Sequence, residues 1–303
     1  MAFVTYFVHI SILSSKSSEK TLNVGCIVIR ERVSEQIYVF TSELYAQVTA
    51  GVIVTKGGTV LVDTLPFPPE SRQMASFARK VRKAGVQYVI LTHYHSDHIN
   101  GAYLFPDADV VAHARCRELI EEVGAKALEE AKGVEPTLEE VSIRLPDITF
   151  DDEEMSLQVG GRPIRLIHAP GHTEDSIMVY VEDDRVLFTS DLAMPVPSIA
   201  DGDIDAFRSS LKKIPELSIE NIVQGHGEVI LRGEVDEVVE RSLNYLDCVE
   251  ATVEEAVEEG KGREFLEAHS IEECGLSRIP LNGMVQQIHT ANLLTIYDLK
   301  VSG

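Results

Sequence analysis

Three histidines and one aspartate lie within six consecutive residues of this 303-residue chain. The run contains His93, His95, Asp97 and His98, and it directly follows residues 86–92, which are mostly apolar and partly β-branched. Such a segment is typical of a buried strand, so we expect the polar side chains on the loop where that strand ends. Imidazole nitrogen and carboxylate oxygen are ordinary ligands of Zn²⁺ and, with less selectivity, of iron or manganese. The run therefore predicts a metal site.

Side chains alternate in direction along an extended chain, and this divides the run into two pairs. His93 and His95 point the same way and can share one ion, whereas Asp97 and His98 point elsewhere and can serve a second ion nearby. A run of surface histidines without function is the alternative interpretation. Short mixed His/Asp clusters with this spacing are metal sites far more often, so we favour the metal site.

Three further polar residues each follow a short apolar segment that is typical of a strand. Glycine, proline or serine flanks each of them, which places them on loops. Loops at the ends of neighbouring strands gather along one edge of a sheet, where they commonly build binding sites. Each signal is weak alone, but the four segments together predict one metal centre. The three residues are His172 after 163–168, Asp191 after 185–188, and His226 after 221–223.

Through these motifs, in this order, the chain resembles the metallo-β-lactamase-fold superfamily from about residue 37 to about residue 230. Residues 50–54 and 59–64 resemble the first strands of that family. The resemblance implies an α/β fold, namely an αββα sandwich with the metal site along one edge, and additional C-terminal helices. It also implies two metal ions, with His93, His95 and His172 on the first, Asp97, His98 and His226 on the second, and Asp191 bridging both.

Asp97 together with the bridging Asp191 resembles the glyoxalase II, lactonase and phosphodiesterase branches of the family. No Cys lies near the motifs, unlike in family β-lactamases that use a Cys ligand. Two dications that share a hydroxide favour a hydrolase of a small ester, lactone, thioester or amide. We expect zinc, with iron or manganese as alternatives, and we expect Asp97 to be catalytic by orienting the hydroxide. Candidate proton donors, by position alone, are Tyr94, Ser96, Thr173 and His168.

Other functions remain open for the same ligand set. One is phosphodiester cleavage, another is an iron-dependent redox reaction of the persulfide dioxygenase kind, and a third is a scaffold that has lost its chemistry. The formal charge of −22 disfavours phosphodiesters and nucleic acid, because proteins that bind polyanions draw on clustered Lys and Arg. It also disfavours an anionic membrane surface. The complete ligand set disfavours the scaffold, and a small molecule is the expected substrate.

The four cysteines are scattered, without a Cys-x-x-Cys pair, and this pattern predicts reduced thiols and a cytoplasmic location. No run of eighteen uncharged apolar residues occurs, so we expect no membrane-spanning helix. The sequence leaves open whether the chain forms a homo-oligomer. The cysteines are Cys26, Cys116, Cys248 and Cys274.

Changes in composition divide the chain into three parts. Residues 1–30 are predicted to form an N-terminal extension or an extra strand, and residues 31–233 the metallo-β-lactamase-like catalytic domain. Residues 234–303 are predicted to be a helical C-terminal extension that packs on this domain, because apolar residues recur at helical spacing there. Asn282 is expected to cap a helix over 282–297. Shorter helices are predicted over 70–83, 115–123 and 204–214, and a hairpin over 176–181 and 185–188.

Three segments are expected to select the substrate. Residues 124–146 are charged and are expected to form a mobile segment over the site, and residues 194–205 form a proline-rich loop. The C-terminal helices are the third segment. Pocket lining is expected from Met194, Val196 and Ile199. Among the remaining histidines, His168 is expected to support the ligands, and His9, His113, His269 and His289 are expected to be structural.

Overall fold

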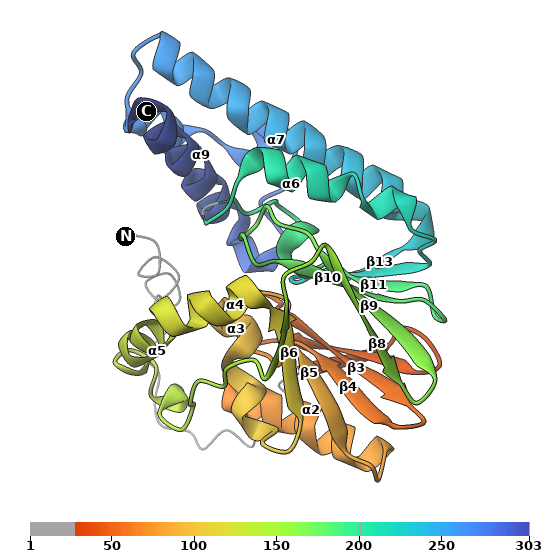
Figure 1. The fold of residues 1–303 in the computed structure, drawn as a ribbon. Helices are drawn as coiled ribbons and strands as arrows, with labels where there is room; N and C mark the ends of the chain where they lie inside the picture. Colours follow the sequence, from red (N-terminus) through yellow and green to blue (C-terminus); the bar gives the residue numbers. More distant parts are fainter. Residues whose placement is uncertain (1–27, 200, 303) are drawn as a thin grey trace.

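The computed structural model describes residues 28–199 and 201–302. Two β-sheets stack face to face, and helices cover the outer side of each sheet (Figure 1). The predicted αββα sandwich with additional C-terminal helices is therefore confirmed. Most of the extension predicted for residues 1–30 lies outside the described residues, as do His9 and Cys26.

The first sheet is mixed, with its strands in sequence order across the sheet. Its first four strands are antiparallel neighbours and the remaining strands run parallel to the fourth. Parallel pairs need crossover connections, and here those connections carry helices. The strands are β1 (Val28–Arg32), β2 (Ile37–Ser42), β3 (Thr49–Thr55), β4 (Gly58–Val62), β5 (Val86–Ile90), β6 (Asp109–His113) and β7 (Ile148–Phe150).

The second sheet has the order β13-β12-β11-β10-β9-β8 and is antiparallel except for the parallel pair β11–β12. The predicted hairpin is present as β10 and β11, whose turn places Arg185 at a positive φ of 53°. The strands are β8 (Glu154–Val159), β9 (Arg162–His168), β10 (Ile177–Val181), β11 (Val186–Phe188), β12 (Asn221–Val223) and β13 (Val229–Leu231).

An apolar core fills the space between the two sheets. Alternate residues of facing strands contribute it, for example Val39 and Ile53 from the first sheet with Ile164 and Val179 from the second. All four side chains are fully buried. Period-two alternation places their neighbours on the opposite faces, where the helices pack. The two sheets thus share one apolar core, and the candidate ligands lie at their common edge.

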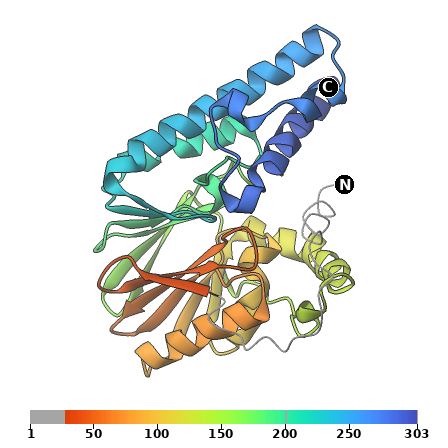
Figure 2. The same cartoon turned by 180° about the vertical axis from the view of Figure 1, so that it is seen from behind.

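Helices cover the outer face of the first sheet (Figure 2). The predicted helix over 70–83 is present as α2 (Pro68–Val81), which begins with two prolines and buries Met74 and Ala78. Proline is well suited to a first helical turn because its missing N–H would have no partner there. The other helices on this side are α3 (Ser96–Ile99), α4 (Ala114–Leu119) and α5 (Ala125–Lys132).

The outer face of the second sheet is covered by the C-terminal helical layer, formed by α6 (Ile204–Leu211), α7 (Val235–Glu258), α8 (Arg263–Ala268) and α9 (Val285–Ser302). Figure 1 shows α7 and α9 crossing above this sheet. Of the predicted apolar stripe of α7, Val235, Val238, Val239 and Leu246 are buried. None of the helices within residues 28–199 and 201–302 has the length and apolarity needed to cross a bilayer.

Two local predictions are wrong. Cys248 and Cys274 form a disulfide across the C-terminal helical layer, whereas reduced thiols were predicted, and Cys116 is buried and free. Asn282 does not cap α9, because it has a φ of 56° in a short turn and the helix begins at Val285. Residues 125–132 of the predicted charged segment form the helix α5, and the mobility expected for this segment stays a prediction.

Candidate metal centre

All seven predicted ligands lie together at one edge of the sandwich. The loop after β5 carries His93 and His95, and α3 carries Asp97 and His98. The remaining ligands come from the second sheet, where His172 follows β9, Asp191 follows β11 and His226 follows β12. Each ligand thus lies just beyond the end of a strand, as the sequence motifs predicted.

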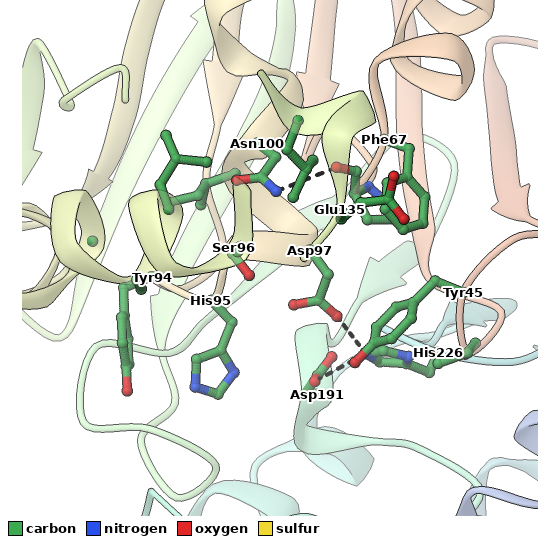
Figure 3. Close-up of a pocket in the computed structure, with 18 of the residues that line it drawn as sticks. Tyr45, Phe67, Tyr94, His95, Ser96, Asp97, Asn100, Glu135, Asp191 and His226 are labelled. Carbon is green, nitrogen blue, oxygen red and sulfur yellow. Dashed lines mark hydrogen bonds and ion pairs between the residues drawn. The ribbon is translucent and has the colours of Figure 1, made fainter. Parts of the chain in front are cut away.

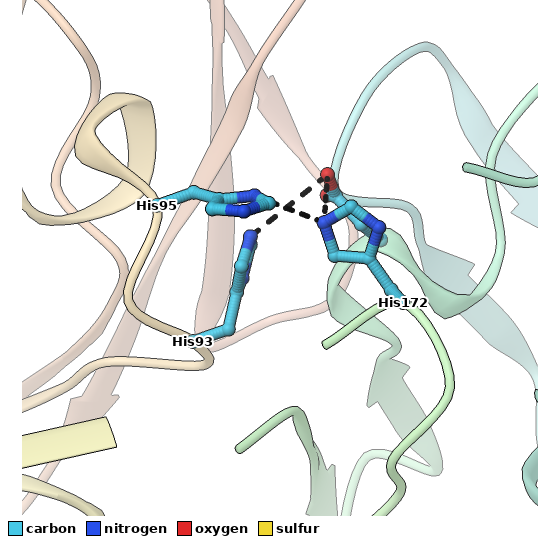
Figure 4. Close-up of side chains that lie close together, drawn as sticks. His93, His95 and His172 are labelled. Carbon is cyan, nitrogen blue, oxygen red and sulfur yellow. Dashed lines mark hydrogen bonds and ion pairs between the residues drawn. The ribbon is translucent and has the colours of Figure 1, made fainter. Parts of the chain in front are cut away.

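One group of ligand atoms comes from His93, His95, His172 and Asp191, and all of these atoms lie within 4.8 Å of one another. Figure 4 shows the three imidazoles pointing toward a common space. Nδ1 of His95 lies 3.0 Å from Nε2 of His172, and that Nε2 lies 3.4 Å from Oδ2 of Asp191. Nε2 of His93 lies 4.0 Å from the same oxygen.

Asp97, His98 and His226 form a second group within the same 4.8 Å limit. Nε2 of His226 lies 3.4 Å from Oδ2 of Asp97, and Nε2 of His98 lies 3.8 Å from it. Asp191 reaches this group too, because its Oδ1 lies 3.4 Å from His98 and its Oδ2 lies 3.3 Å from His226. The carboxylate of Asp191 therefore contacts both groups.

The carboxylate of Asp191 has room because Gly225, next to His226, carries no side chain. A Cβ atom on Gly225 would lie only 1.9 Å from Oδ1 of Asp191. Real atoms do not approach so closely, so any larger residue at this position would displace the carboxylate. The glycine that precedes His226 is therefore required for the position of the Asp191 carboxylate.

Hydrogen bonds on the far ring nitrogens orient the imidazoles. Nδ1 of His172 donates to the Ser198 carbonyl at 2.7 Å, and Nδ1 of His226 donates to the Ala46 carbonyl at 2.9 Å. A proton on Nδ1 leaves the Nε2 lone pair facing the centre. In His93, Nδ1 lies 3.0 Å from a hydroxyl, Oγ of Ser190, and its Nε2 likewise faces inward.

Asp63 is a supporting residue that the sequence reasoning missed. Its Oδ2 accepts from Nδ1 of His98 at 2.9 Å, and its two oxygens also accept from the amide and hydroxyl of Thr92 at 2.8 Å. It lies at a φ of 59°, directly after β4. The signal was available, because Asp63 follows an apolar strand just as Asp191 does.

His95 is oriented in the opposite sense. Its Nε2 lies 3.2 Å from Oδ2 of Asp201, so its Nδ1 is the nitrogen that faces the centre. Asp201 belongs to the 194–205 loop, which was predicted to select substrate, yet the residue itself was not singled out. A carboxylate on the outer nitrogen of an imidazole raises the basicity of the inner nitrogen.

The final helix holds the loop that supports His172. In α9, Oδ1 of Asn292 accepts from the Ile199 amide at 2.9 Å, and its Nδ2 donates to the Pro197 carbonyl at 2.7 Å. Between these two contacts lies Ser198, whose carbonyl accepts from His172. We call this arrangement the Asn292 clamp. Its only sequence signal was a polar residue within an apolar helical pattern.

The missing hydrogen bonds of three buried atoms indicate whether the seven residues fit metal ions. Nε2 of His93, Nε2 of His98 and Oδ1 of Asp191 are buried and have no hydrogen-bond partner among the described residues. Buried polar atoms without partners are unfavourable, and their presence calls for an explanation. All three face the space shared by the seven ligands. Two divalent cations there would satisfy them, and nitrogen with carboxylate oxygen suits zinc, iron or manganese.

The imidazoles have opposite electrostatic surroundings. Burial, with the neighbouring His98 and His95, lowers the pKa of His93, and burial together with His95 lowers the pKa of His172 to about 4. Burial alone would also lower the pKa of His98, but nearby carboxylates, led by Asp191, raise it to about 10. Without metal, His93 and His172 are therefore neutral, while His98 must release a proton before it can act as a ligand.

A pocket opens onto the centre, with His95, Asp97, Asp191 and His226 at its floor (Figure 3). Residues of α5 and its neighbours form one wall, so the 124–146 segment does line the site. Met194 lines the pocket as predicted, but Val196 and Ile199 do not, because both are buried in the C-terminal helical layer. The C-terminal part of the chain contributes Ile288 of α9 and Met284, which directly precedes this helix.

Of the four candidate proton donors, two line the pocket and two do not. Tyr94 and Ser96 line the pocket. Thr173 is buried, with its hydroxyl 2.7 Å from Oγ of Ser176. His168 stacks on His113, with ring centroids 4.1 Å apart, and donates to the Glu174 carbonyl at 2.9 Å. None of its contacts is with a ligand, so the expectation that it supports them is wrong.

Tyr45 is a pocket residue that the sequence reasoning did not consider. Burial, with the charges of Asp97 and Asp191, raises the pKa of its phenol well above the ordinary value. Figure 3 shows its ring next to His226. The hydroxyl is therefore protonated at neutral pH close to the floor of the pocket.

Known proteins are similar to this chain over most of the two-sheet sandwich. The family model described as "Metallo-beta-lactamase superfamily" matches residues 45–226, which is more than half of the chain. The matched segment contains all seven candidate ligands and ends at His226. It does not include α7, α8 or α9.

Two curated relatives illustrate the similarity. A beta-lactamase-like protein 2 homolog from Caenorhabditis elegans is 25% identical over 191 residues, which cover 62% of this chain and 57% of the relative. An atrochrysone carboxyl ACP thioesterase from Pseudocercospora fijiensis is 26% identical over 185 residues, which cover 61% and 49%. The chain spans about half the length of the curated relatives that it matches.

Among solved structures, an inverting sec-alkylsulfatase from Pseudomonas sp. has a TM-score of 0.71 at 16% identity. The similarity covers 90% of this chain and 50% of that chain. At this level of identity it shows the fold alone. The fold that the two proteins share nevertheless extends beyond residues 45–226, into the C-terminal helices.

Proposed function

Because the chain belongs to the metallo-beta-lactamase superfamily, we propose that it is a hydrolase with two divalent metal ions, most suitably zinc, acting on a small ester, lactone, thioester or amide. The observation that carries the proposal is the orientation of the imidazoles. Each is anchored through its outer nitrogen, so that the inner nitrogen faces a space next to Asp191. In this proposal His93, His95 and His172 would hold the first ion, Asp97, His98 and His226 would hold the second, and Asp191 would contribute to both.

When bound, two such cations supply hydroxide at neutral pH and polarise the carbonyl of the substrate. The residues of the chain supply position and protons. Asp97 lies at the pocket floor with Oδ2 3.4 Å from His226, where its carboxylate can accept a hydrogen bond from the attacking water and orient it. Tyr45 and Tyr94, both protonated at neutral pH, line the space that the leaving group would occupy. A relative named as a thioesterase supports acyl-bond hydrolysis.

Metal analysis combined with a substrate panel tests the proposal. The protein is purified with and without oxygen, reconstituted with zinc, manganese or iron, and assayed on esters, lactones, thioesters and amides. We expect about two metal equivalents per chain and hydrolysis by the zinc form. One iron per chain, with oxygen uptake on a thiol substrate and no hydrolysis, would contradict it and favour the redox function. Phosphodiester turnover without carbonyl turnover would also contradict it.

A matched histidine variant serves as the control. His168→Gln replaces a histidine outside the ligand cluster, where the ring stacks on His113. This variant should keep its metal content and its activity, because its contacts lie away from the seven ligands.

A further inference from the structure

The pocket above the proposed centre has one long apolar wall. Residues 114–143, which lie between β6 and β7, place the inner face of α5 against the opening. Leu128 and Leu138 are buried there, and they pack with Phe67 and Ile143 in a small apolar cluster. On the opposite side, Ile288 of α9 and Met284, which directly precedes this helix, complete the lining. A substrate that reaches the centre therefore passes between two apolar surfaces.

Small residues on α5 and just before it leave room in this wall. Gly124, Ala127 and Ala131 all line the pocket, at spacings of three and four residues that place them on one helix face. The charged residues Lys126, Glu129 and Glu130 do not line the pocket, and they are exposed. This amphipathic pattern turns the apolar face of α5 toward the substrate space.

The pocket also lacks a cation. Among the described residues that line it, none is Lys or Arg. Apart from the residues of the proposed centre, the charged lining residues are Glu135 and Asp201. An anionic group away from the metal ions would meet two carboxylates and no counter-charge, which is unfavourable at a desolvated site.

On these observations, and resting on the proposed hydrolase function, we propose that the pocket selects substrates whose acyl group is an uncharged apolar chain. The chain lies against α5 and α9, and a carboxylate, phosphate or sulfate at its far end is excluded. Burying one methylene stabilises binding enough for about a fourfold gain in affinity, so selectivity should grow with chain length until the wall is filled.

A matched pair of ester substrates tests this directly. The zinc-reconstituted protein is assayed on p-nitrophenyl acetate, butyrate, hexanoate and octanoate, and on the mono-p-nitrophenyl ester of adipic acid. The adipate ester has the chain length of the hexanoate but ends in a carboxylate. We expect kcat/KM to rise about tenfold or more from acetate to hexanoate, and to fall about tenfold or more from hexanoate to the adipate ester.

The outcomes separate this inference from the proposed function. Turnover of these esters with a flat or falling dependence on chain length, or with no loss for the adipate ester, would overturn the inference alone. Absence of turnover for every ester, lactone, thioester and amide would instead remove the hydrolase function on which the inference rests.

Two arginine substitutions on α5 test the wall itself. Ala127→Arg places a cation on the face that lines the pocket, whereas Ala125→Arg places one on an exposed position of the same helix. The first should shift the hexanoate-to-adipate ratio of kcat/KM about tenfold or more toward adipate, and the second should leave the ratio unchanged.

A third substitution, at a position that is already exposed, keeps the test decisive if Ala127→Arg does not fold. Val134 lines the pocket and is already 41% exposed, so Val134→Lys should be tolerated by the fold. It should shift the same ratio in the same direction by a smaller factor, since the site is at the solvent-exposed rim. An unchanged ratio in folded Ala127→Arg and Val134→Lys proteins, checked by circular dichroism, would overturn the inference.

Discussion

Among the described residues, histidines lie together with other possible metal ligands at two places. One is the proposed metal centre at the edge of the sheets, and the other is a helical cluster formed by His269, Cys274 and His289 in the C-terminal layer. In both places the ligand atoms lie within 4.8 Å of one another. Distance therefore does not separate them, but their surroundings do.

The nitrogens of the helical cluster have partners of their own. Nδ1 of His269 lies 3.2 Å from Nε2 of His289, whose Nδ1 lies 3.0 Å from the Tyr245 hydroxyl. Cys274 is joined to Cys248. The proposed centre instead contains two carboxylates and inward-facing atoms without partners. The comparison teaches that unsatisfied buried atoms and carboxylates among the candidate ligands, more than proximity, favour a metal site.

The largest expected contrast is between His95→Ala and His289→Ala. Removal of His95 takes away a ligand atom of the first group, so turnover on any substrate should be abolished while the protein stays folded. Removal of His289 takes away none of the seven candidate ligands and reaches Asn292 only indirectly, through the Tyr245 hydroxyl, so metal content and most activity should remain. Metal analysis and kcat/KM of both variants, with circular dichroism as the check on folding, measure the contrast. Undiminished turnover by His95→Ala would remove the proposed site.

Two matched carboxylate substitutions, one in each cluster, test the comparison next. Asp191→Asn should lower the occupancy of both ions, because Asp191 contacts both ligand groups. Glu273→Gln is the matched change in the helical cluster, where Glu273 lies 3.7 Å from His269. This control should leave metal content unchanged. Metal per chain after dialysis measures both variants, and full loading of Asp191→Asn would exclude a bridging role.

The Asn292 clamp predicts a smaller effect that passes from the helical layer to the centre. Asn292→Ala frees the backbone on both sides of Ser198, so His172 loses its fixed acceptor. Loss of such outer contacts typically costs about 10- to 100-fold in metal affinity or activity. Thr290→Val, which removes a hydroxyl bonded to the Gln286 carbonyl on the same helix, is the control. Equal metal affinities in the two variants, measured by competition with a chelator, would contradict the clamp.

The smallest expected effect is the pH dependence of stability in the metal-free protein. The pKa of His98 is raised to about 10 by nearby carboxylates, so its stabilising contribution is complete below pH 6.5 and is lost as the pH rises toward 10. Burial, with the neighbouring His269, lowers the pKa of His289 to about 4. Its neutral form therefore favours the folded state above pH 6.5, and this contribution is lost as the pH falls toward 4.

Thermal unfolding of two variants separates these contributions. His98→Gln should flatten the decline of Tm on the alkaline side, and His289→Gln should flatten it on the acid side. If both variants altered the same side, the opposite pKa shifts assigned to the two clusters would be wrong.

Local pattern was sufficient to predict where the candidate ligands lie. Apolar runs followed by Gly, Pro or Ser place His172, Asp191 and His226 at strand ends, and the structure brings all three to the same edge. Because loops after neighbouring strands share an edge, a one-dimensional pattern carries this three-dimensional information. The sandwich itself followed from the family resemblance.

Partners that are distant in the chain could not be predicted in the same way. Asp63 meets His98 across 35 positions, and Asn292 meets Ile199 across 93. A polar residue in an apolar pattern does not reveal which backbone group it will bond. The bond between Cys248 and Cys274 likewise depends on how α7 packs against the segment before α9, and no spacing motif signals it.

The Asn292 clamp also bears on what counts as the smallest working unit of this protein. The residues that contact the proposed ions end at His226, yet one that keeps a contacting imidazole aligned lies 66 positions later, on the last helix. A fragment that stops at Leu231 would retain every atom of the inner coordination set and lack this support. In the proposed centre, the terminal helix therefore supports a ligand in addition to covering the second sheet.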